Sequence, residues 1–453
     1  MLLSLKLLKN NAFSVSSIKF LQLLIHSMEH SVFGCKVNKF YLNKRLQYFH
    51  ARWYSPEQVH IMATCVVTDR AKSKRVRAAR LHLEKWKQLF LTWCGAFEKG
   101  EAMDYEKFYQ IYPSLLPFRE QITLLWEDPA GQTDLGNIGE YELNSEMTIE
   151  DTTIQERAAS FGKRLHTKKF LVIQSWCDTF CTFCLTIYKR WSQRSRPLEE
   201  IIAEINEFVE QWGQEIVLTW VNLASWWASN TRKPQENRFS ELLEAILDRT
   251  EISRIRISSL GPEFLDDRFF KLMENTRFLP HFHLSIQHFD DTVLRRMNRN
   301  YDYTTLDRVL SWLRWLERPD RDLISIWADL IVWFPWETEE QFCVMYDAVQ
   351  KYAITKLHAF PFSPHQKGES VPAGKLDGQL DITVKRERMN RLMDVWDKVR
   401  NEFLENNQWV SWPVLLEKKI DATRQGRTAN YIEVVIPDPK GVLKRGQVVN
   451  WTI

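Results

Sequence analysis

The sequence predicts an α/β protein in three parts: an N-terminal parallel α/β domain, a central partial (βα)6 barrel and a small C-terminal β-barrel. Three observations carry this prediction. Apolar stretches near the N-terminus each lead into a cysteine, and these cysteines are 30 and 29 residues apart, about the length of one βαβ unit. Further along, six strand-like runs alternate with helical patterns. The tail alternates polar with apolar residues.

Composition places the 453 residues among globular proteins. Hydrophobic residues make up 44% and charged residues 26% of the chain, which excludes wholesale disorder and fibrous repeats. The formal net charge of +3 is too small to indicate nucleic-acid binding without local basic patches. The sequence has no run of 18 or more apolar residues, so a membrane-spanning helix is not predicted and we expect a cytoplasmic protein.

Residues 1–27 are expected to be an upstream extension without a fold of its own. Their apolar patches are interrupted by lysines and asparagines, and no small-residue cleavage site follows a continuous apolar core, which disfavours a secretory signal. Met28 opens the segment MEHSVFGCKVN, which has the pattern of a first strand entering a turn. We therefore predict that Met28 is the true start and that the N-terminal domain covers residues 28–126.

Three of the seven cysteines, Cys35, Cys65 and Cys94, follow the apolar stretches of this domain. Because the carboxyl ends of parallel strands lie side by side at one edge of a sheet, their thiolates can converge there. Such convergence would indicate a metal site, and three unrelated core cysteines are the alternative. An odd number of cysteines in a long chain argues against a disulfide framework and for a reducing compartment. Cys343 lies in an amphipathic helical pattern and is interpreted as a small buried residue.

A polar, aperiodic stretch over residues 127–166 predicts a linker, and the barrel domain is predicted over residues 167–395. Helical patterns such as PLEEIIAEINEFVEQ separate its strands, as in a parallel, partly closed barrel. In such barrels the chemistry lies on the loops that follow the strands. The strand-like runs are 170–174, 215–221, 254–260, 281–287, 324–334 and 356–362.

A charged helical pattern, VKRERMNRLMDVWDKVRNEFLENN, leads out of the barrel, and residues 396–412 are predicted to be a connecting helix. Residues 413–453 alternate polar and apolar side chains around glycine and proline turn signals, which predicts a small antiparallel β-barrel. This tail has seven Lys and Arg against four Asp and Glu. Its positive charge fits an RNA-binding surface and fits a solvated face equally well.

Cys177, Cys181 and Cys184 form a C-x3-C-x2-C triplet in the loop after the first barrel strand. No fourth Cys or His stands at zinc-finger spacing, so the triplet does not complete a tetrahedral zinc site. Three thiolates can instead hold three irons of a four-iron cluster and leave the fourth iron open to an exchangeable ligand. A zinc site that shares a distant ligand is the alternative.

The chain resembles the radical S-adenosylmethionine (SAM) methylthiotransferases from Met28 to Ile453. The GCKVN form of its first cysteine motif is most similar to the branch, often called MtaB, that methylthiolates N(6)-threonylcarbamoyladenosine 37 in tRNA. The segments that carry the resemblance are FGCKVNKF, ATCVVTDRAKSK, LTWCGA, FLVIQSWCDTFCTFC, RSRPLEEI, EIVLTWVNL, RIRISSL, HFHLSIQ, VLRRMNR and ADLIVWFPWETEEQF.

This resemblance implies two [4Fe–4S] clusters, one for each trio of cysteines. The tail, which includes TANYIEV, would be the family's RNA-binding TRAM barrel. The implied ligands of the auxiliary cluster are Cys35, Cys65 and Cys94. The implied ligands of the cluster that binds SAM through its amino and carboxylate groups are Cys177, Cys181 and Cys184.

The implied activity is methylthiolation at C2 of the tRNA adenosine. One SAM methylates sulfur at the auxiliary cluster, and a second is cleaved to a 5′-deoxyadenosyl radical that takes hydrogen from C2. An inert C–H bond requires a cofactor rather than a general base. His281, His283 and Asp329 are therefore interpreted as core or wall residues, and no catalytic side chain is named. The implied partners are tRNA, a sulfur donor and a reducing electron donor.

Three other functions stay open. Two are methylthiotransferase branches that act on isopentenyladenosine in tRNA or on a ribosomal-protein aspartate, and the GCKVN motif argues against both. The third is a catalytically inactive RNA-binding protein that keeps its clusters. Basic stretches after two of the cysteine motifs could hold RNA phosphates or could form solvated helix faces. They comprise Lys72, Lys74, Arg75, Arg77, Arg80, Lys189, Arg190, Arg194 and Arg196.

The counts of tryptophan and glycine are anomalous, at 19 and 15, because ordinary usage predicts about 32 glycines. The family's glycines occupy tight turns or cofactor contacts from which a Cβ is excluded. We therefore expect that a codon meaning glycine in the source organism, with UGA the obvious candidate, is written here as tryptophan. The alternative is a literal sequence with a remodelled SAM pocket, and Trp226 and Trp396 are candidates for genuine tryptophans. The positions where the family has glycine are Trp53, Trp93, Trp176, Trp191, Trp220, Trp327, Trp333 and Trp336.

Overall fold

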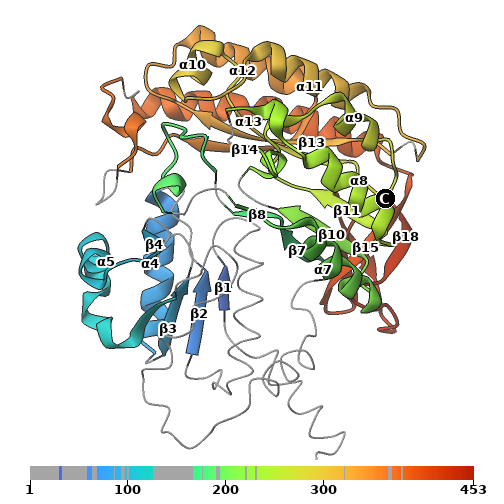
Figure 1. The fold of residues 1–453 in the computed structure, drawn as a ribbon, viewed down its shortest axis with the longest axis horizontal. Coiled ribbons are helices and arrows are strands. Elements are labelled where there is room, and N and C mark those ends of the chain that lie inside the picture. Colours follow the sequence, from blue (N-terminus) through green and yellow to red (C-terminus); the bar gives the residue numbers. More distant parts are fainter. Residues whose placement is uncertain are drawn as a thin grey trace, which may run out of the picture. The chain divides into compact units, whose positions relative to one another are not determined.

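A computed structural model of the chain is drawn in Figure 1. The chain divides into two compact units, of which the second holds residues 166–453 together with two short earlier stretches. The predicted segments 1–27 and 127–166 lie outside the described residues. The structure describes residues 30–32, 59–63, 69–85, 87–92, 97–98, 101–125, 167–175, 177–189, 194–219, 222–229, 232–320, 322–365, 370–378 and 381–453.

The N-terminal unit contains a four-stranded parallel sheet in the order β1-β2-β3-β6. Ile61, Leu89 and Leu91 are buried on its strands, and the predicted parallel arrangement of the apolar stretches is confirmed. The sheet strands are β1 (His30–Val32), β2 (Val59–Ala63), β3 (Gln88–Thr92) and β6 (Ile122–Leu125). The other elements of this part of the chain are α4 (Asp69–Leu83), β4 (Phe97–Glu98), β5 (Glu101–Ala102), α5 (Tyr105–Ile111) and the 3-10 helix η2 (Pro113–Gln121).

Two three-stranded parallel sheets, in the orders β7-β10-β11 and β12-β13-β14, form the barrel domain. Parallel bridges from Ile255 to Phe278 and from Leu260 to Leu284 connect them. The six strands therefore form a partly closed barrel in chain order, as the alternating pattern predicts. They are β7 (Lys169–Val172), β10 (Glu215–Thr219), β11 (Arg254–Ile257), β12 (His281–Gln287), β13 (Ser325–Val332) and β14 (Ile354–Pro361).

Amphipathic helices alternate with these strands and lie along their outer side (Figure 1). In the first of them, Ile201, Ile205 and Phe208 are buried while the acidic residues of the first turn are exposed, which is the period of a helix that covers a sheet. The helices are α7 (Leu198–Glu210), α8 (Phe239–Arg249), α9 (Asp267–Leu272), α10 (Asp291–Arg296), α11 (Tyr303–Trp315) and α12 (Glu339–Lys351). The shorter pieces are β8 (Gln174–Ser175), β9 (Arg194–Ser195), η4 (Thr186–Tyr188), η5 (Leu223–Ser225), η6 (Pro234–Glu236), η7 (Pro262–Phe264) and η8 (Pro372–Lys375).

The tail is a four-stranded antiparallel sheet in the order β17-β16-β15-β18. Trp412, Val414 and Ile436 are buried in its own small core, together with Leu279 of the barrel domain, which confirms the predicted small antiparallel β-structure. The long helix α13 (Ile382–Asn406) precedes it and begins earlier than the pattern indicated, because Asp381 caps its first turn. The strands are β15 (Ser411–Ile420), β16 (Thr423–Arg427), β17 (Glu433–Pro437) and β18 (Val448–Thr452).

A buried ion cluster joins the tail to the barrel. Glu215, at the start of β10, accepts from Arg256 at 2.9 Å and Arg254 at 3.0 Å, and Lys168 Nζ lies 3.2 Å from it. Lys168 also pairs with Glu417 of β15 at 2.8 Å, and Arg256 donates to the backbone carbonyl of residue 429 at 3.0 Å. Because Glu215 is fully buried, its carboxylate offsets several cations that water cannot reach.

Replacement of Glu215 by glutamine is expected to lower the free energy of unfolding by about 3–5 kcal/mol, because it leaves buried cations without their anion. Although burial opposes ionisation, Arg256, Lys168 and Arg254 hold the pKa of Glu215 well below its usual value of 4.5. This stability is therefore fully present above pH 4.5 and is lost progressively as the pH falls from 4.5 toward the lowered pKa of the folded state. Urea unfolding of both proteins at pH 7 and at pH 3 measures the two effects.

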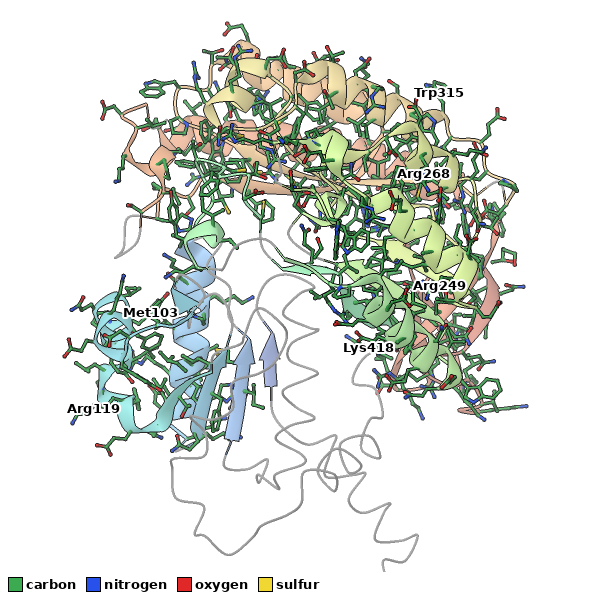
Figure 2. The ribbon with its side chains drawn as sticks, in the orientation of Figure 1. Met103, Arg119, Arg249, Arg268, Trp315 and Lys418 are labelled. Carbon is green, nitrogen blue, oxygen red and sulfur yellow. The ribbon has the colours of Figure 1, made fainter. Side chains whose placement is uncertain are left out.

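The matched control is Glu199→Gln, which breaks an exposed pair with Arg249 on the outer surface (Figure 2). Solvent screens such pairs, so we expect little change from that substitution. Equal effects of Glu215→Gln and Glu199→Gln would contradict a structural role for the buried cluster.

Candidate functional site

The cysteine triplet lies in the loop at the carboxyl end of the barrel's first strands. Cys181 is buried, and Cys177 and Cys184 are half-buried. The three thiols lie close enough together for Cys181 to raise the pKa values of Cys177 and Cys184.

The last residue of α10 and the segment that follows it hold the triplet loop in place. Arg299 Nη1 donates to Cys181 Sγ at 3.1 Å, and Thr182 Oγ1 donates to the carbonyl of Arg296 at 2.8 Å. Asn298 Nδ2 donates to the carbonyls of residues 179 and 180 at 3.0 and 2.9 Å. These anchors were not named from the sequence, although VLRRMNR contains three of them. Their signal was a resemblance to family sequence rather than a chemical pattern.

Electrostatics oppose free thiolates in this loop. Burial, followed by the neighbouring Cys181, raises the pKa of Cys177 to about 12. A hydrogen bond between its sulfur and Thr179 Oγ1, 3.1 Å apart, opposes this shift. Burial and Cys181 also raise the pKa of Cys184. Three anionic sulfurs in one buried loop therefore require compensating positive charge, which iron supplies when a cluster is bound. The donor set fits such a cluster.

Two buried acceptors lie on the loops that follow the next two strands. Within the described residues, Asn222 Oδ1 and both carboxylate oxygens of Glu263 are buried without a hydrogen-bond partner. Gly261 lies beside both acceptors. A Cβ built on it would lie 2.8 Å from Asn222 Oδ1 and 2.9 Å from Glu263 Oε2. A cofactor with hydrogen-bond donors, such as SAM, needs acceptors without other partners and space beside them. The two acceptors and the space that the missing Cβ of Gly261 leaves fit that requirement. Sequence reasoning named neither side chain.

A second polar cluster lies on β12, β13 and β14, inside the barrel. Asp329 Oδ1 is 2.8 Å from His283 Nε2 and 3.1 Å from His358 Nδ1. Although burial opposes ionisation, the two histidines hold the pKa of Asp329 below its usual range. Trp327 packs edge-on against His281 and His283. The interpretation of His281, His283 and Asp329 as wall residues stays a prediction.

Helix α4 buries some side chains of the first basic stretch and exposes others. On α4, Lys72 and Arg75 are buried, and the Arg75 guanidinium lies 4.3 Å from the centre of the Tyr112 ring. Lys74 and Arg77 are exposed. Fewer side chains of this helix are therefore available to RNA phosphates than the sequence suggested. In the second stretch, Lys189 is buried.

Several tryptophans occupy a backbone conformation that favours glycine. Among the described residues, five of the thirteen non-glycine residues with positive φ are tryptophan. Trp333 (φ 70°) ends β13 at the position where the family has glycine, which is why that strand stops short of the predicted Phe334. Trp226 and Trp396, by contrast, are buried and donate to backbone carbonyls at 3.2 and 3.1 Å. The five tryptophans with positive φ are Trp212, Trp227, Trp333, Trp336 (φ 59°) and Trp409.

The first trio of cysteines lies outside the described residues, as do Trp53, Trp93, Trp176, Trp191 and Trp220, which are predicted to be glycine in the natural protein. The strands that precede Cys35, Cys65 and Cys94 are neighbours in one parallel sheet. Their convergence stays a prediction.

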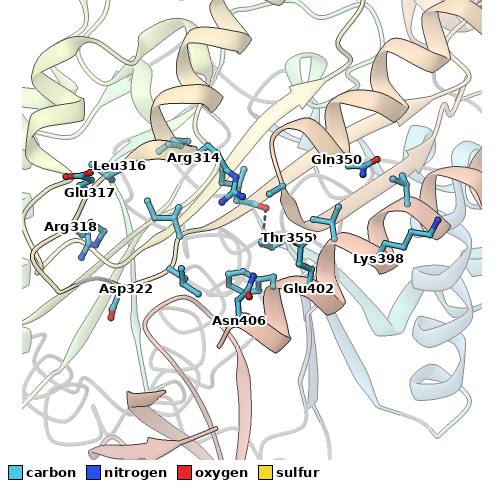
Figure 3. A pocket seen from close by; sticks show the side chains of 18 residues that line it. Arg314, Leu316, Glu317, Arg318, Asp322, Gln350, Thr355, Lys398, Glu402 and Asn406 are labelled. Atoms are coloured by element: carbon cyan, nitrogen blue, oxygen red, sulfur yellow. Dashed lines mark hydrogen bonds between the residues drawn. The ribbon is translucent and has the colours of Figure 1, made fainter. Parts of the chain in front are cut away.

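A cavity of about 650 Å³ (Figure 3) has no residue of the triplet in its lining. Ile324 and Thr355, at the amino ends of β13 and β14, line it together with Glu402 of α13. In parallel barrels the chemistry lies at the opposite, carboxyl ends of the strands. This cavity is therefore not the candidate site.

The partial barrel and its cysteine triplet define a radical SAM protein, and residues 171–349 match the family model described as the radical SAM superfamily. The chain is 30% identical over 319 residues to tRNA-2-methylthio-N(6)-dimethylallyladenosine synthase of Agrobacterium fabrum, over 69% of this chain and 68% of that one. It is 27% identical over 436 residues to threonylcarbamoyladenosine tRNA methylthiotransferase MtaB of Bacillus subtilis, over 92% and 91%. It is 26% identical over 397 residues to ribosomal protein uS12 methylthiotransferase RimO of Alkaliphilus oremlandii, over 85% and 83%. The chain belongs to the radical SAM methylthiotransferase family and is an enzyme of that class.

An iron–sulfur cluster and SAM are the cofactors of this class of enzyme. No described helix is both long and apolar enough to cross a membrane.

Proposed function

We propose that this enzyme methylthiolates C2 of N(6)-threonylcarbamoyladenosine 37 in tRNA. The observation that carries the proposal is the triplet Cys177, Cys181 and Cys184 after the first strands of a six-stranded barrel, in a chain whose first cysteine motif reads GCKVN. The first feature supports SAM-dependent radical chemistry. The second supports the choice of branch.

The triplet would hold the cluster that binds SAM, and Cys35, Cys65 and Cys94 would hold an auxiliary four-iron cluster. Bound cluster and SAM supply a radical able to remove hydrogen from an unactivated C–H bond, which side-chain acids and bases cannot do. The chain positions the SAM cluster through Arg299, whose guanidinium donates to Cys181 Sγ. Asn298 donates to the loop backbone and limits its movement.

A tRNA partner is proposed from the named activities of the relatives from Bacillus subtilis and Agrobacterium fabrum. The C-terminal antiparallel sheet is proposed as the TRAM-type surface that contacts it. Lys418, Lys419 and Lys440 are exposed there, whereas Arg424 and Arg427 pair with carboxylates. Phosphate contacts would come first from the unpaired lysines, because a paired arginine must give up its carboxylate to bind phosphate. A sulfur donor and a reducing electron donor complete the proposed reaction.

Nucleoside analysis of tRNA tests this proposal. In cells without the gene, we expect threonylcarbamoyladenosine to accumulate and its 2-methylthio derivative to be absent, and the gene should restore the derivative. Liquid chromatography with mass spectrometry measures both nucleosides. Loss of 2-methylthio-isopentenyladenosine instead would select the second tRNA branch.

Two further outcomes would contradict the proposal. Unchanged tRNA together with a lost methylthio group on ribosomal protein uS12 would select the protein-directed branch. Unchanged tRNA and protein, with clusters present and no 5′-deoxyadenosine formed, would identify an inactive RNA-binding protein.

A further inference from the structure

Glu263 is a buried carboxylate that the fold does not explain. It lies in η7, just beyond the carboxyl end of β11. Neither of its side-chain oxygens is solvent-accessible or has a hydrogen-bond partner on another described residue. Burial raises the pKa of Glu263, and Arg299 is the cation that opposes this shift. A buried acceptor without a donor is strongly disfavoured. A donor from outside the chain would remove that penalty.

The surroundings of Glu263 indicate where that donor would come from. Asn222 Oδ1 is a second orphaned acceptor, and it faces the same Gly261 that Glu263 Oε2 faces. The positive charge of Arg299 opposes the rise in the pKa of Glu263. The same guanidinium donates to Cys181 Sγ. The two acceptors therefore lie at the carboxyl ends of β10 and β11, on the same side of the barrel as the cysteine triplet.

The chemistry of these acceptors fits one cofactor. SAM carries N–H donors on its methionine end and O–H donors on its ribose, and the triplet leaves one iron for it. We infer that Glu263 binds SAM, its carboxylate accepting hydrogen bonds from these donors beside Asn222. This inference rests on the proposed function, because it requires the triplet to hold the SAM cluster.

Gly261 keeps this site open. Its φ of −82° and ψ of 123° are extended values that any residue adopts, so the backbone does not require glycine there. An added methyl group would instead meet both acceptor oxygens at less than 3.0 Å. Gly261→Ala is therefore a steric test of the site that introduces no backbone strain.

The test measures SAM binding by equilibrium dialysis on the full chain, reconstituted anaerobically with iron and sulfide. We expect Glu263→Gln to weaken SAM binding about tenfold or more, because a charge-assisted acceptor becomes a neutral amide. Gly261→Ala should weaken it similarly. Glu274→Gln replaces an exposed carboxylate just after α9. It is the matched control and should leave SAM binding unchanged.

Competition with the two halves of SAM identifies the donor. If methionine competes with SAM less well in Glu263→Gln than in the unsubstituted chain, the amino group of SAM is the donor to Glu263. If 5′-deoxyadenosine competes less well, the ribose hydroxyls are the donors. Thermal unfolding of the same proteins separates binding from folding, since a carboxylate that serves only the fold would lower the melting temperature without changing SAM affinity.

Two outcomes would overturn the inference in different ways. If the unsubstituted chain binds SAM and Glu263→Gln binds it within twofold as tightly, Glu263 has no role in binding and the proposed function is unaffected. If the unsubstituted chain holds no iron at the triplet and binds no SAM, the proposed function fails and this inference fails with it.

Discussion

Replacement of Cys181 by alanine is expected to abolish both SAM cleavage and tRNA methylthiolation. Cys181 is the buried member of the triplet, and its sulfur also accepts from Arg299 at 3.1 Å. Two remaining thiolates cannot hold three irons of a four-iron cluster. With the two proposed clusters, iron content should therefore fall from about eight to about four atoms per chain. Iron analysis and detection of 5′-deoxyadenosine after anaerobic purification measure these losses.

Cys343→Ala is the matched control. This cysteine lies on α12 and is half-buried rather than buried as the sequence pattern predicted. Its thiol donates to Glu339 at 3.7 Å, and it belongs to neither cysteine trio. Iron content and product formation should stay unchanged. A Cys181→Ala enzyme that retained eight irons, or that still formed 2-methylthio nucleoside, would remove the basis for assigning the SAM cluster to the triplet.

Replacement of Trp212 and Trp409 by glycine is expected to stabilise the protein. Both have left-handed backbone, with φ of 61° and 65°, and their side chains are 85% and 87% exposed. That conformation costs a residue with a Cβ about 1–2 kcal/mol. An exposed indole offsets little of this cost because it packs against few neighbours. The double substitution should therefore raise the free energy of unfolding by about 2 kcal/mol after glycine's own entropy cost. Urea unfolding measures this gain.

Trp396→Gly is the opposite control. Its indole is buried, donates to the carbonyl of Thr355 at 3.1 Å and lies within helix α13. Its loss should cost about 3–5 kcal/mol, because a large buried side chain leaves a cavity. A gain at Trp212 and Trp409 with a loss at Trp396 supports glycine at the first two positions in the natural protein. Equal losses at all three would indicate that tryptophan is genuine throughout.

The same reasoning applies to the loop that follows β13. Trp333 and Trp336 have φ of 70° and 59°, and Glu337 accepts from the backbone N–H of residue 333. The centre of the Trp333 ring lies 5.8 Å from Lys385 Nζ, and the Trp336 indole lies against Gly378. Mass spectrometry of protein made in its own organism decides the matter directly, and indole-bearing peptides across these positions would refute the glycine interpretation.

Much of the fold could be predicted because its signals are local. Apolar runs about 30 residues apart became neighbouring parallel strands, and the alternating pattern became a six-stranded barrel. The triplet was visible because its three thiols lie within eight residues of sequence. Boundaries were less accurate where one residue decides them: β13 ends at Val332, and α13 begins beside its cap Asp381.

Contiguous sequence was thus sufficient to predict the cysteine-triplet loop and the class of enzyme. The surroundings of that loop depended on folding. Arg299 lies 118 residues after Cys181, and Asn222 and Glu263 meet only because β10 and β11 are hydrogen-bonded neighbours. Periodicity and spacing carry no information about such contacts. Whether a buried carboxylate finds a donor depends on the side chains that distant strands bring to it, and no stretch of sequence contains that information alone.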